Sequence, residues 1–299
     1  MKVLCFGSLN IDYTYRVDHF VQKGETLSSE SLQVFSGGKG LNQSIALSKA
    51  GVETYHAGKI GEDGRFLLEM MEHAGVNTSL VEISRDVRTG NAIIQNDKSG
   101  DNCILLYGGA NQAITKDQVD EVIRHFEAGD YLVLQNEINE LSYIMEAAHN
   151  KGMKIVLNPS PMNEKIFKLP LETVDVFMLN EVEASQILGK ASAKDADMDA
   201  LADELHAKYP DAVIVLTIGS AGSIYMGNGK KFRQPVYKVK AVDTTAAGDT
   251  FTGFFIGGQL RGLSAEDSMD LASRAAAIAV TRPGAAPSIP ELVEVEKFH

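Results

Sequence analysis

Apolar residues along this chain follow two different spacings. Short apolar or β-branched runs occur at residues 2–7 (KVLCFG), 130–135 (DYLVLQ), 154–159 (KIVLNP), 174–179 (VDVFML) and 212–217 (AVIVLT). Between such runs, stretches such as 64–75 and 139–152 have apolar residues at the spacing of one face of a helix. Strand-like runs that alternate with amphipathic helices predict an α/β fold with a parallel sheet wrapped by helices.

Two segments depart from this rhythm. Residues 11–35 and 89–107 alternate apolar and polar positions around turn-forming sequence, such as KSGDN in the second segment. This alternation predicts antiparallel strands outside the main sheet. We therefore expect a main α/β domain of residues 1–10, 37–88 and 108–299, and a β-sheet lid of residues 11–36 and 89–107. Such a lid could cover a site, form a dimer surface, or do both.

Polar residues follow the predicted strands where α/β proteins bind ligands, which is beyond the carboxyl ends of parallel strands. Asn10 and Asp12 follow the first run. The other polar sets are Asn136 with Glu137, Asn180 with Glu183, TIGSAGS at 217–223, and DTTAAGD at 243–249 after the strand-like KVKAV of 238–242. Several polar sets at one sheet edge predict a binding site there.

The glycine-rich segment GGKGLNQS at residues 37–44 has two interpretations. A glycine-rich turn that opens a helix can bind phosphate through free N–H groups, and Lys39 would add positive charge. The segment matches neither the Walker nor the dinucleotide-binding glycine pattern, and it follows a lid segment rather than a core strand. On its own, it predicts an anion site or an ordinary tight turn equally well.

The segment DTTAAGDTFTGFF at residues 243–255 predicts a helix that begins near Ala247. Ala246, Ala247 and Gly248 would then present N–H groups without intrahelical partners, at the positive end of the helix dipole. This arrangement would bind an anion. Asp249 in the first turn could serve chemistry, or could merely stabilise the dipole by about 0.3–1 kcal/mol.

Composition and charge narrow the function classes. The chain has 299 residues with 44% hydrophobic and 23% charged residues, a formal net charge of -12 and a pI of about 5.1. Scattered basic residues on an acidic protein argue against nucleic-acid binding. Cys5 and Cys103 lie in strand-like runs, which predicts buried free thiols and a reducing cytoplasm. No apolar run reaches the length of a membrane span.

Taken together, the motifs resemble the ribokinase-like (PfkB) carbohydrate kinase family over nearly the whole chain. They are GSLNID at 7–12, GGKGLNQS, GGAN at 108–111, NEVEA at 180–184, TIGSAGS, DTTAAGDTFTG, and AAAIAVTRPGAAPSIP at 275–290. The resemblance implies a three-layer α/β/α fold with a mostly parallel central sheet and a small antiparallel β-sheet lid. It also implies transfer of the γ-phosphoryl group of ATP to a sugar hydroxymethyl group.

The resemblance also implies roles for individual residues. Asp249 would be the general base, and the N–H groups of Ala246, Ala247 and Gly248 would form an anion hole for the transferring phosphoryl group, which suits a reaction driven by positioning and charge stabilisation. Besides Asp249, the sugar would be bound by Asn10, Asp12, Gly38, Lys39, Asn42 and Glu137. Carboxylates and amides suit sugars because they hydrogen-bond vicinal hydroxyl groups.

The implied nucleotide and ion sites use other residues. ATP would be held by Asn180, Thr217, Gly219, Ser220, Gly222, Gly248 and Ser273. Glu183 would help to hold Mg²⁺ through water, since magnesium keeps much of its hydration shell. A monovalent cation, K⁺, would be held by Asp243 and by the carbonyl groups of Thr245, Val280, Pro283 and Ala285.

The resemblance favours D-ribose as the substrate and D-ribose 5-phosphate as the product. Asn91 and Tyr107 in the lid depart from the small apolar residues usual there, so deoxyribose, fructose or a nucleoside remain alternatives. Pro283 is a second departure, which leaves the strength of K⁺ dependence open. A non-catalytic sugar or nucleotide sensor is a further alternative, because a fold does not establish activity. The resemblance also implies a homodimer through the lid strands.

Overall fold

The computed structural model describes residues 1–190, 192 and 196–298. Its main sheet has nine strands. In spatial order these are β13 (Lys230–Gln234), β12 (Ser223–Gly227), β11 (Val213–Thr217), β10 (Val176–Asn180), β9 (Lys154–Asn158), β8 (Tyr131–Gln135), β1 (Val3–Phe6), β4 (Thr54–Gly61) and β5 (Asn77–Ser84). The strands from β11 to β5 run parallel, and β12 and β13 are antiparallel additions at one edge. The prediction of a mostly parallel sheet is confirmed.

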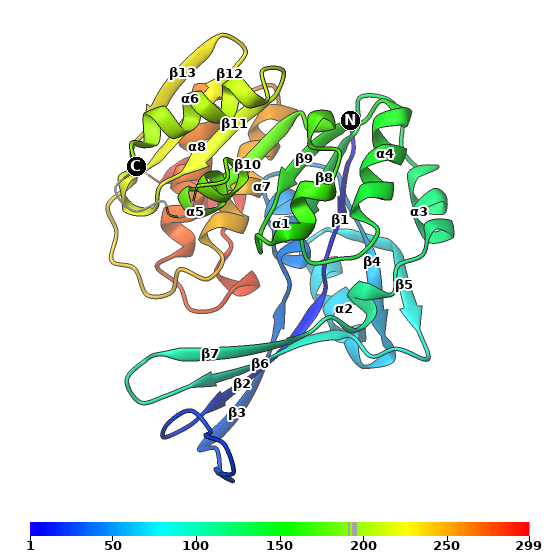
Figure 1. Ribbon diagram of the computed structural model, residues 1–299, viewed down its shortest axis with the longest axis vertical. Helices are drawn as coiled ribbons and strands as arrows, with labels where there is room; N and C mark the ends of the chain where they lie inside the picture. The colour runs from blue at the N-terminus through cyan, green and yellow to red at the C-terminus, as the bar shows by residue number, and fades with distance from the viewer. Residues whose placement is uncertain (191, 193–195, 299) are drawn as a thin grey trace.

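Helices cover both faces of this sheet, as Figure 1 shows. The α-helices are α1 (Lys39–Lys49), α2 (Arg65–His73), α3 (Lys116–Ile123), α4 (Leu141–Lys151), α5 (Glu181–Ile187), α6 (Met198–Lys208), α7 (Ala247–Leu260), α8 (Ala265–Ala279) and α9 (Leu292–Lys297). Short 3-10 turns are η1 (Glu62–Gly64), η2 (Gly109–Gln112), η3 (Glu164–Lys168), η4 (Leu171–Thr173), η5 (Gly219–Ala221) and η6 (Ala286–Ser288). No helix in the described ranges is long and apolar enough to cross a membrane.

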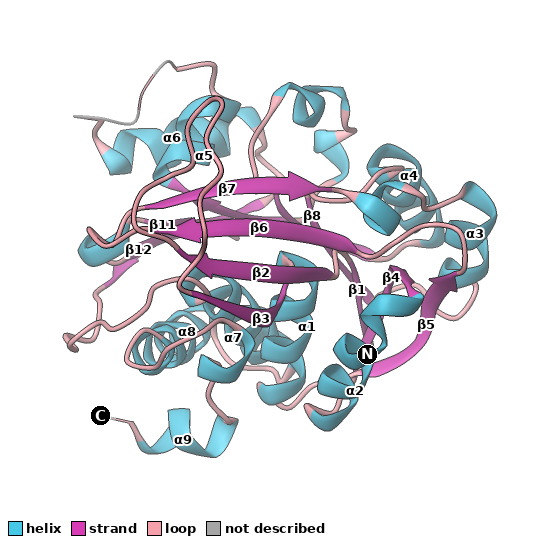
Figure 2. Ribbon diagram, turned by 90° about the horizontal axis from the view of Figure 1, so that it is seen from below, coloured by secondary structure: helices cyan, strands magenta, loops and turns pink. Residues whose placement is uncertain are grey.

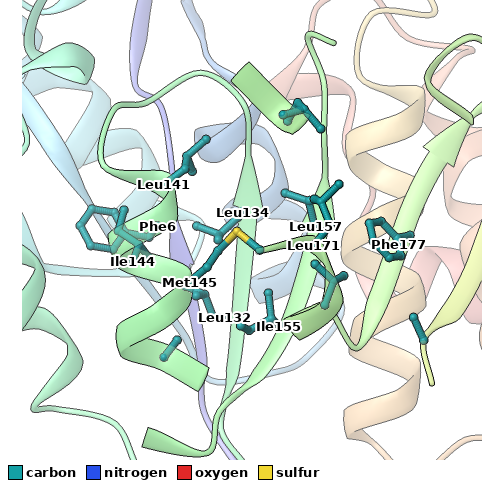
Figure 3. Packing of buried hydrophobic residues seen from close by; sticks show 14 of the residues in the cluster. Phe6, Leu132, Leu134, Leu141, Ile144, Met145, Ile155, Leu157, Leu171 and Phe177 are labelled. Atoms are coloured by element: carbon teal, nitrogen blue, oxygen red, sulfur yellow. The ribbon is translucent and has the colours of Figure 1, made fainter. Parts of the chain in front are cut away.

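The core consists of two apolar layers separated by the sheet. Leu4 and Phe6 of β1 join the layer under α3, α4, α5 and α6, part of which Figure 3 shows. Val3 and Cys5, which alternate with them, join the layer under α1, α2, α7 and α8. Successive residues of a strand point to opposite faces, so a strand buried on both faces reads as a continuous apolar run. This explains why KVLCFG and the similar runs predict central strands.

The lid is a separate sheet of four strands in the order β3 (Ser31–Gly37), β2 (Asn10–Arg16), β6 (Gly90–Asn96) and β7 (Asn102–Tyr107). It projects from the main domain in Figure 1 and crosses the molecule in the view of Figure 2. The pairs β2–β3 and β6–β7 are antiparallel, and the central pair β2–β6 is parallel. Each segment with period-two alternation therefore forms the expected antiparallel pair outside the main sheet, whereas the parallel pairing of β2 with β6 was not predicted.

Two sequence predictions about local structure are wrong. Residues 238–242, the strand-like KVKAV, form no strand, and the chain runs on as an irregular segment from the end of β13 to α7. Val239 and Ala241 of this segment line a cavity instead of joining the sheet, and Val242 is exposed. Cys103 is exposed on β7, whereas Cys5 is buried as expected. Apolar content alone could not separate a core strand from a strand at the edge of the lid.

Candidate active site

The candidate site lies beyond the carboxyl ends of the parallel strands, where α1, α5 and α7 begin. Helix α7 begins at Ala247, as predicted, and places Asp249 in its first turn. Asp249 is only 5% exposed. Gly253 of α7 would carry a Cβ only 2.4 Å from the Cβ of Ala46 in α1. The two helices therefore approach closely, and their packing brings Asp249 to the start of α1.

A cavity of about 100 Å³ lies in front of Asp249. Its walls come from several elements, and the residues are Lys39, Asn158, Ser160, Met178, Leu179, Asn180, Glu183, Thr217, Thr245, Gly248, Asp249 and Thr252. The cation of Lys39 thus shares this small cavity with the carboxylates of Asp249 and Glu183. Burial favours the neutral amine of Lys39, but the surrounding carboxylates outweigh burial and raise the pKa of Lys39 above its usual range. The side chain is therefore a cation at neutral pH.

A second cavity, of about 680 Å³, adjoins the first and shares Asn180, Thr217 and Gly248 with it. All the residues predicted to hold ATP line this cavity, namely Asn180, Thr217, Gly219, Ser220, Gly222, Gly248 and Ser273. Its apolar walls include Val236, Val239 and Phe251. This size suits a ligand of several hundred daltons, and apolar walls with a few polar groups are typical of such sites.

The predicted anion hole is brought together only in part. Gly248 lines both cavities and Ala247 lines the larger one. Ala246 is 2% exposed, and its own backbone carbonyl accepts the N–H of Thr250 at 2.9 Å. The N–H of Ala247 donates to the Thr244 carbonyl oxygen at 3.2 Å. In this geometry Gly248 is the anion-hole residue best placed to meet a ligand in both cavities.

Two amides hold the carboxylate of Asp249. Nδ2 of Asn42 donates to Oδ2 at 3.1 Å, and Nε2 of Gln43 donates to Oδ1 at 2.9 Å. Burial is the strongest influence on Asp249 and raises the pKa of its carboxyl group, while the Lys39 ammonium and the two amide donors partly oppose that rise. A buried carboxylate with a raised pKa is a better proton acceptor than an exposed one.

The residues predicted to bind sugar gather at the junction of the lid and the main domain. Oε2 of Glu137 accepts the backbone N–H of Lys39 at 2.9 Å and also accepts the hydroxyl of Ser8. Burial, followed by repulsion from the Glu137 carboxylate, raises the pKa of Asp12 to about 6. Two neighbouring carboxylates at the mouth of the lid form an acceptor-rich surface, which suits hydroxyl donors.

Close backbone packing explains the glycines beside this cluster. Gly38 has φ 98°, and a Cβ there would lie 2.8 Å from the carbonyl oxygen of Ser8. A Cβ on Gly40 would lie 2.4 Å from the backbone nitrogen of Ser8. The glycine-rich segment therefore brings α1 against the loop after β1, and this close approach places Lys39 in the small cavity.

Glu183 caps the start of α5 and also lines the small cavity. It forms a capping box at the start of α5, where its Oε2 accepts the Asn180 N–H at 3.0 Å and its own N–H donates to Oδ1 of Asn180 at 2.8 Å. Glu183 is 4% exposed, and burial raises the pKa of its carboxyl group. The described residues contain no cluster of three or more His, Cys, Asp or Glu for a metal ion. A lone carboxylate fits Mg²⁺, which proteins bind through one or two carboxylates, substrate phosphates and water.

Comparison with known proteins agrees with this geometry. The model of the pfkB family carbohydrate kinases matches residues 1–292. This chain belongs to that family. It is 34% identical to the ribokinase of Staphylococcus aureus (strain COL), with 99% of both chains covered. The crystal structure of Cryptococcus neoformans ribokinase in complex with ADP matches with a TM-score of 0.87 at 33% identity, covering 99% of both chains. Arabidopsis thaliana ribokinase, complexed with ribose and ATP, matches with a TM-score of 0.86 at 27% identity, covering 100% of this chain and 99% of that one.

In this PfkB-family chain, the residues predicted to bind K⁺ form a contact between two loops. Asp243 accepts the N–H of Thr245 at 2.9 Å through Oδ1 and that of Gly284 at 2.9 Å through Oδ2. Burial tends to raise the pKa of Asp243, but these hydrogen bonds outweigh it and hold that pKa below its usual value. The carbonyls of Val280 and Ala285 each accept two hydrogen bonds already. They fit a cation less well than the carbonyl groups of Thr245 and Pro283 do, because each would have to give up a bond.

The lid register changes the interpretation of Asn91 and Tyr107. Asp12 pairs with Ala92, which pairs with Leu106. Asn91 pairs with Tyr107 in the neighbouring row. Adjacent rows of a sheet point to opposite faces. Asn91 and Tyr107, the two departures noted in the sequence, therefore lie on the face opposite Asp12, a residue predicted to bind the sugar.

Several polar residues of the PfkB site have no counterpart among the predictions. Gln43 contacts Asp249, Asn158 lines the small cavity, and Asn111 donates from Nδ2 to Oδ1 of Asn10 at 2.7 Å. The sequence contained a signal for two of these three residues. Gln43 follows Asn42 in GGKGLNQS. Asn158 follows the apolar residues of the strand-like run KIVLNP, just as Asn136 and Asn180 follow the apolar residues of their runs. Asn111 lies in GGAN, but its contact with β2 depends on the tertiary fold.

Proposed function

We propose that this carbohydrate kinase transfers the γ-phosphoryl group of ATP to the hydroxymethyl group of D-ribose, giving D-ribose 5-phosphate and ADP. The observation that carries the proposal is the position of Asp249. Its carboxylate lines a small cavity that shares three residues with the nucleotide-sized cavity, and it accepts the amide of the sugar-side residue Asn42. A base between the two substrate sites is what in-line phosphoryl transfer needs.

In the proposed reaction, the hydroxymethyl oxygen forms a bond to the γ-phosphorus as the bond to the β–γ bridging oxygen breaks. The carboxylate of Asp249 takes the hydroxyl proton. The N–H of Gly248, at the positive end of α7, faces the negative charge on the transferring group. The Lys39 ammonium faces the same small cavity and adds positive charge. The chain's own groups thus serve to position the reactants and to balance charge.

We propose Mg²⁺ and K⁺ as the ions of this site. Glu183 would hold Mg²⁺ through water, and the bound ion would neutralise charge on the phosphate oxygens. Asp243 with the carbonyl groups of Thr245, Val280, Pro283 and Ala285 would hold K⁺ beside the start of α7. The hydrogen bonds of Asp243 to Thr245 and Gly284 support this placement, because they fix the loop that would carry the ligands.

Ribose is favoured over the alternative substrates by two observations. The curated relative at 34% identity over 99% of the chain is a ribokinase. In addition, Asn91 and Tyr107, the lid residues that raised deoxyribose, fructose and nucleosides as candidates, lie on the face opposite Asp12. The sugar would instead meet the Asp12 face, which carries the small apolar residue Ala92.

We also propose that the lid closes over the sugar and forms a homodimer contact. Strand β7 is exposed along its whole length, with Ile104, Leu105 and Leu106 each at least 54% exposed. Strand β3 exposes Leu32, Val34 and Phe35. Apolar patches of this kind mark interaction surfaces. Light scattering of the purified chain would report a dimer, and Leu105→Glu should shift it to the monomer; a monomer before substitution would disprove this assignment.

The experiment that tests the function is an ATP-consumption assay over a panel of pentoses, hexoses and nucleosides, with and without K⁺. We expect ribose to give the largest kcat/KM, and ³¹P-coupled NMR of the product to locate the phosphate on O5. A larger kcat/KM for another sugar would overturn ribose but keep the kinase. If no member of the panel stimulated ATP use, the non-catalytic sensor would be the better account.

A further inference from the structure

Three amides form a network behind Asp249: those of Gln43 and Gln135 are buried, and that of Asn158 is half-buried. Nε2 of Gln43 donates to Oδ1 of Asp249 at 2.9 Å and to Oδ1 of Asn158 at 3.1 Å. Oε1 of Gln43 accepts Nε2 of Gln135 at 2.7 Å. Both N–H groups and the carbonyl oxygen of one amide are therefore used. Gln43 is 0% exposed and Gln135 is 1% exposed, so water does not compete for these contacts.

The neighbours of Gln43 leave its amide only one orientation. If the amide were turned over, its oxygen would face the oxygens of Asp249 and Asn158, and its NH₂ group would face the NH₂ group of Gln135. Asn158 is itself fixed, because its Nδ2 donates to the Met178 carbonyl oxygen at 2.9 Å. A donor with a single allowed orientation defines where its acceptor must lie.

Gln135 packs in turn against the backbone of the loop after β1. A Cβ on Gly7 would lie 2.4 Å from Oε1 of Gln135 and 2.6 Å from the Cα of Gly40. The Gln135 amide thus fills a space that only a glycine leaves open. Oε1 of Gln135 is buried without a hydrogen-bond partner among the described residues. An unpaired buried oxygen is costly, so its retention suggests that the opposite end of this amide, which meets Gln43, is needed.

We propose that Gln43 is a positioning residue that fixes the plane of the Asp249 carboxylate, with Gln135 and Asn158 setting the orientation of the Gln43 amide. Asn42 holds Oδ2 and Gln43 holds Oδ1, so the two donors together prevent rotation about the bond to the carboxylate. Gln43 does not line either cavity and acts through Asp249. The inference rests on the proposed role of Asp249 as the base.

The network also reaches the carboxylate proposed for Mg²⁺. Nδ2 of Asn158 approaches Oε2 of Glu183 to 3.5 Å, which is the limit of a hydrogen bond. Gln43 and Glu183 are thus linked through one asparagine.

The test compares Gln43→Met with the unmodified chain, using any sugar that the unmodified chain accepts. Methionine keeps the length and unbranched shape of glutamine but removes both donors. We expect kcat to fall about 10- to 100-fold with a nearly unchanged KM for ATP, since a misplaced reacting group costs rate rather than binding. We also expect the acid limb of the kcat/KM profile to move to higher pH, because loss of a donor to the carboxylate raises the pKa of Asp249.

The other titratable groups that face Asp249 are unchanged in this comparison, namely Lys39 at the start of α1, Glu183 in α5 and the neutral Cys5 thiol of β1. Ser44→Ala is the matched control. It removes a buried hydrogen bond of the same helix, between Oγ of Ser44 and Nδ1 of His56 at 2.7 Å, without touching Asp249. A general loss of α1 stability would affect both variants, whereas a shifted acid limb should appear only with Gln43→Met.

Gln135→Met provides a second variant if Gln43→Met fails to fold. It leaves the Asp249 contact in place and removes the group that orients Gln43, so a smaller fall in kcat with the same direction of shift is expected. An unshifted acid limb and a kcat within about twofold of the unmodified chain in folded variants would overturn the proposal. That result differs from failure of the proposed function, in which the unmodified chain itself would phosphorylate no sugar.

Discussion

The amide of Asn42 donates to the carboxylate of Asp249 at 3.1 Å, although the two residues are 207 positions apart in the chain. The contact exists because α1 and α7 pack closely. Cβ atoms on Gly253 and Gly257 would lie 2.4 Å and 2.5 Å from the Cβ atoms of Ala46 and Ala50. Glycines within α7 are therefore needed for its approach to α1. The geometry of the proposed base depends on this helix packing.

Replacing Asp249 with asparagine should abolish turnover while leaving nucleotide binding intact. Asparagine has nearly the same shape but cannot take the hydroxyl proton, so we expect kcat to fall by about 10²- to 10⁴-fold. ATP affinity, measured by calorimetry, should change little, since the nucleotide-sized cavity is lined by other residues. A variant within tenfold of the original rate would show that Asp249 is not the base.

Replacing Gly248 with alanine should keep or raise the thermal midpoint of unfolding, whereas replacing Gly253 with alanine should lower it. Nothing lies within 4 Å of a Cβ on Gly248, which faces both cavities. Gly248→Ala should fold with an equal or higher thermal midpoint, because alanine favours helix over glycine by roughly 1 kcal/mol. It should nevertheless lose most activity, since the methyl group would occupy the phosphoryl position.

Gly253→Ala in the same helix is the control. Its Cβ would lie 2.4 Å from the Cβ of Ala46. Overpacking of this kind costs about 1–3 kcal/mol, so the midpoint should fall. Calorimetric unfolding of both variants, beside their kcat values, separates a glycine needed for a ligand from one needed for packing. An active Gly248→Ala variant would argue against the anion hole.

The fold was predictable from the sequence largely because the central strands are buried on both faces. KIVLN and VIVLT could not be solvated, so each had to be a central strand or a buried helix, and their length favoured strands. The segment KVKAV at 238–242 misled this reasoning. Its apolar residues Val239 and Ala241 line the large cavity, and a cavity wall needs apolar surface as much as a core does.

The site was predictable where function requires backbone geometry or charge. The position of Asp249 in the first turn of α7 followed from the alanines and glycine before it. The contacts of Asp249 did not, because Asn42 and Gln43 reach its carboxylate only when α1 packs on α7. The lid face was also misjudged. A shift of one residue in register exchanges the two faces of a strand, and sequence alternation alone could not say which face meets Asp12.

Sugar binding should weaken as the pH falls through about 6, because burial and the Glu137 carboxylate raise the pKa of Asp12 to about 6. Above that pH Asp12 is ionised and both of its oxygens could accept sugar hydroxyl groups; below it, one oxygen is protonated. We expect the KM for ribose to rise about tenfold towards acid pH, which corresponds to one hydrogen bond to a charged group. Asp12→Asn should show the high KM at every pH. A pH-dependent KM that survives this substitution would assign the titration to another group.

Replacing Glu183 with glutamine should separate its role in capping α5 from its proposed role in holding Mg²⁺. Glutamine can still accept the Asn180 N–H, since a capping box accepts either residue, so the thermal midpoint should be nearly unchanged. The charge that would hold the hydrated Mg²⁺ is lost, so the Mg²⁺ concentration for half-maximal rate should rise about 10-fold or more. Titration of Mg²⁺ at fixed ATP measures this directly. Glu146→Gln, on an exposed position of α4, controls for the change in net charge. If both variants kept the original Mg²⁺ requirement, Glu183 would be a helix cap alone, and the metal would depend on ATP and water.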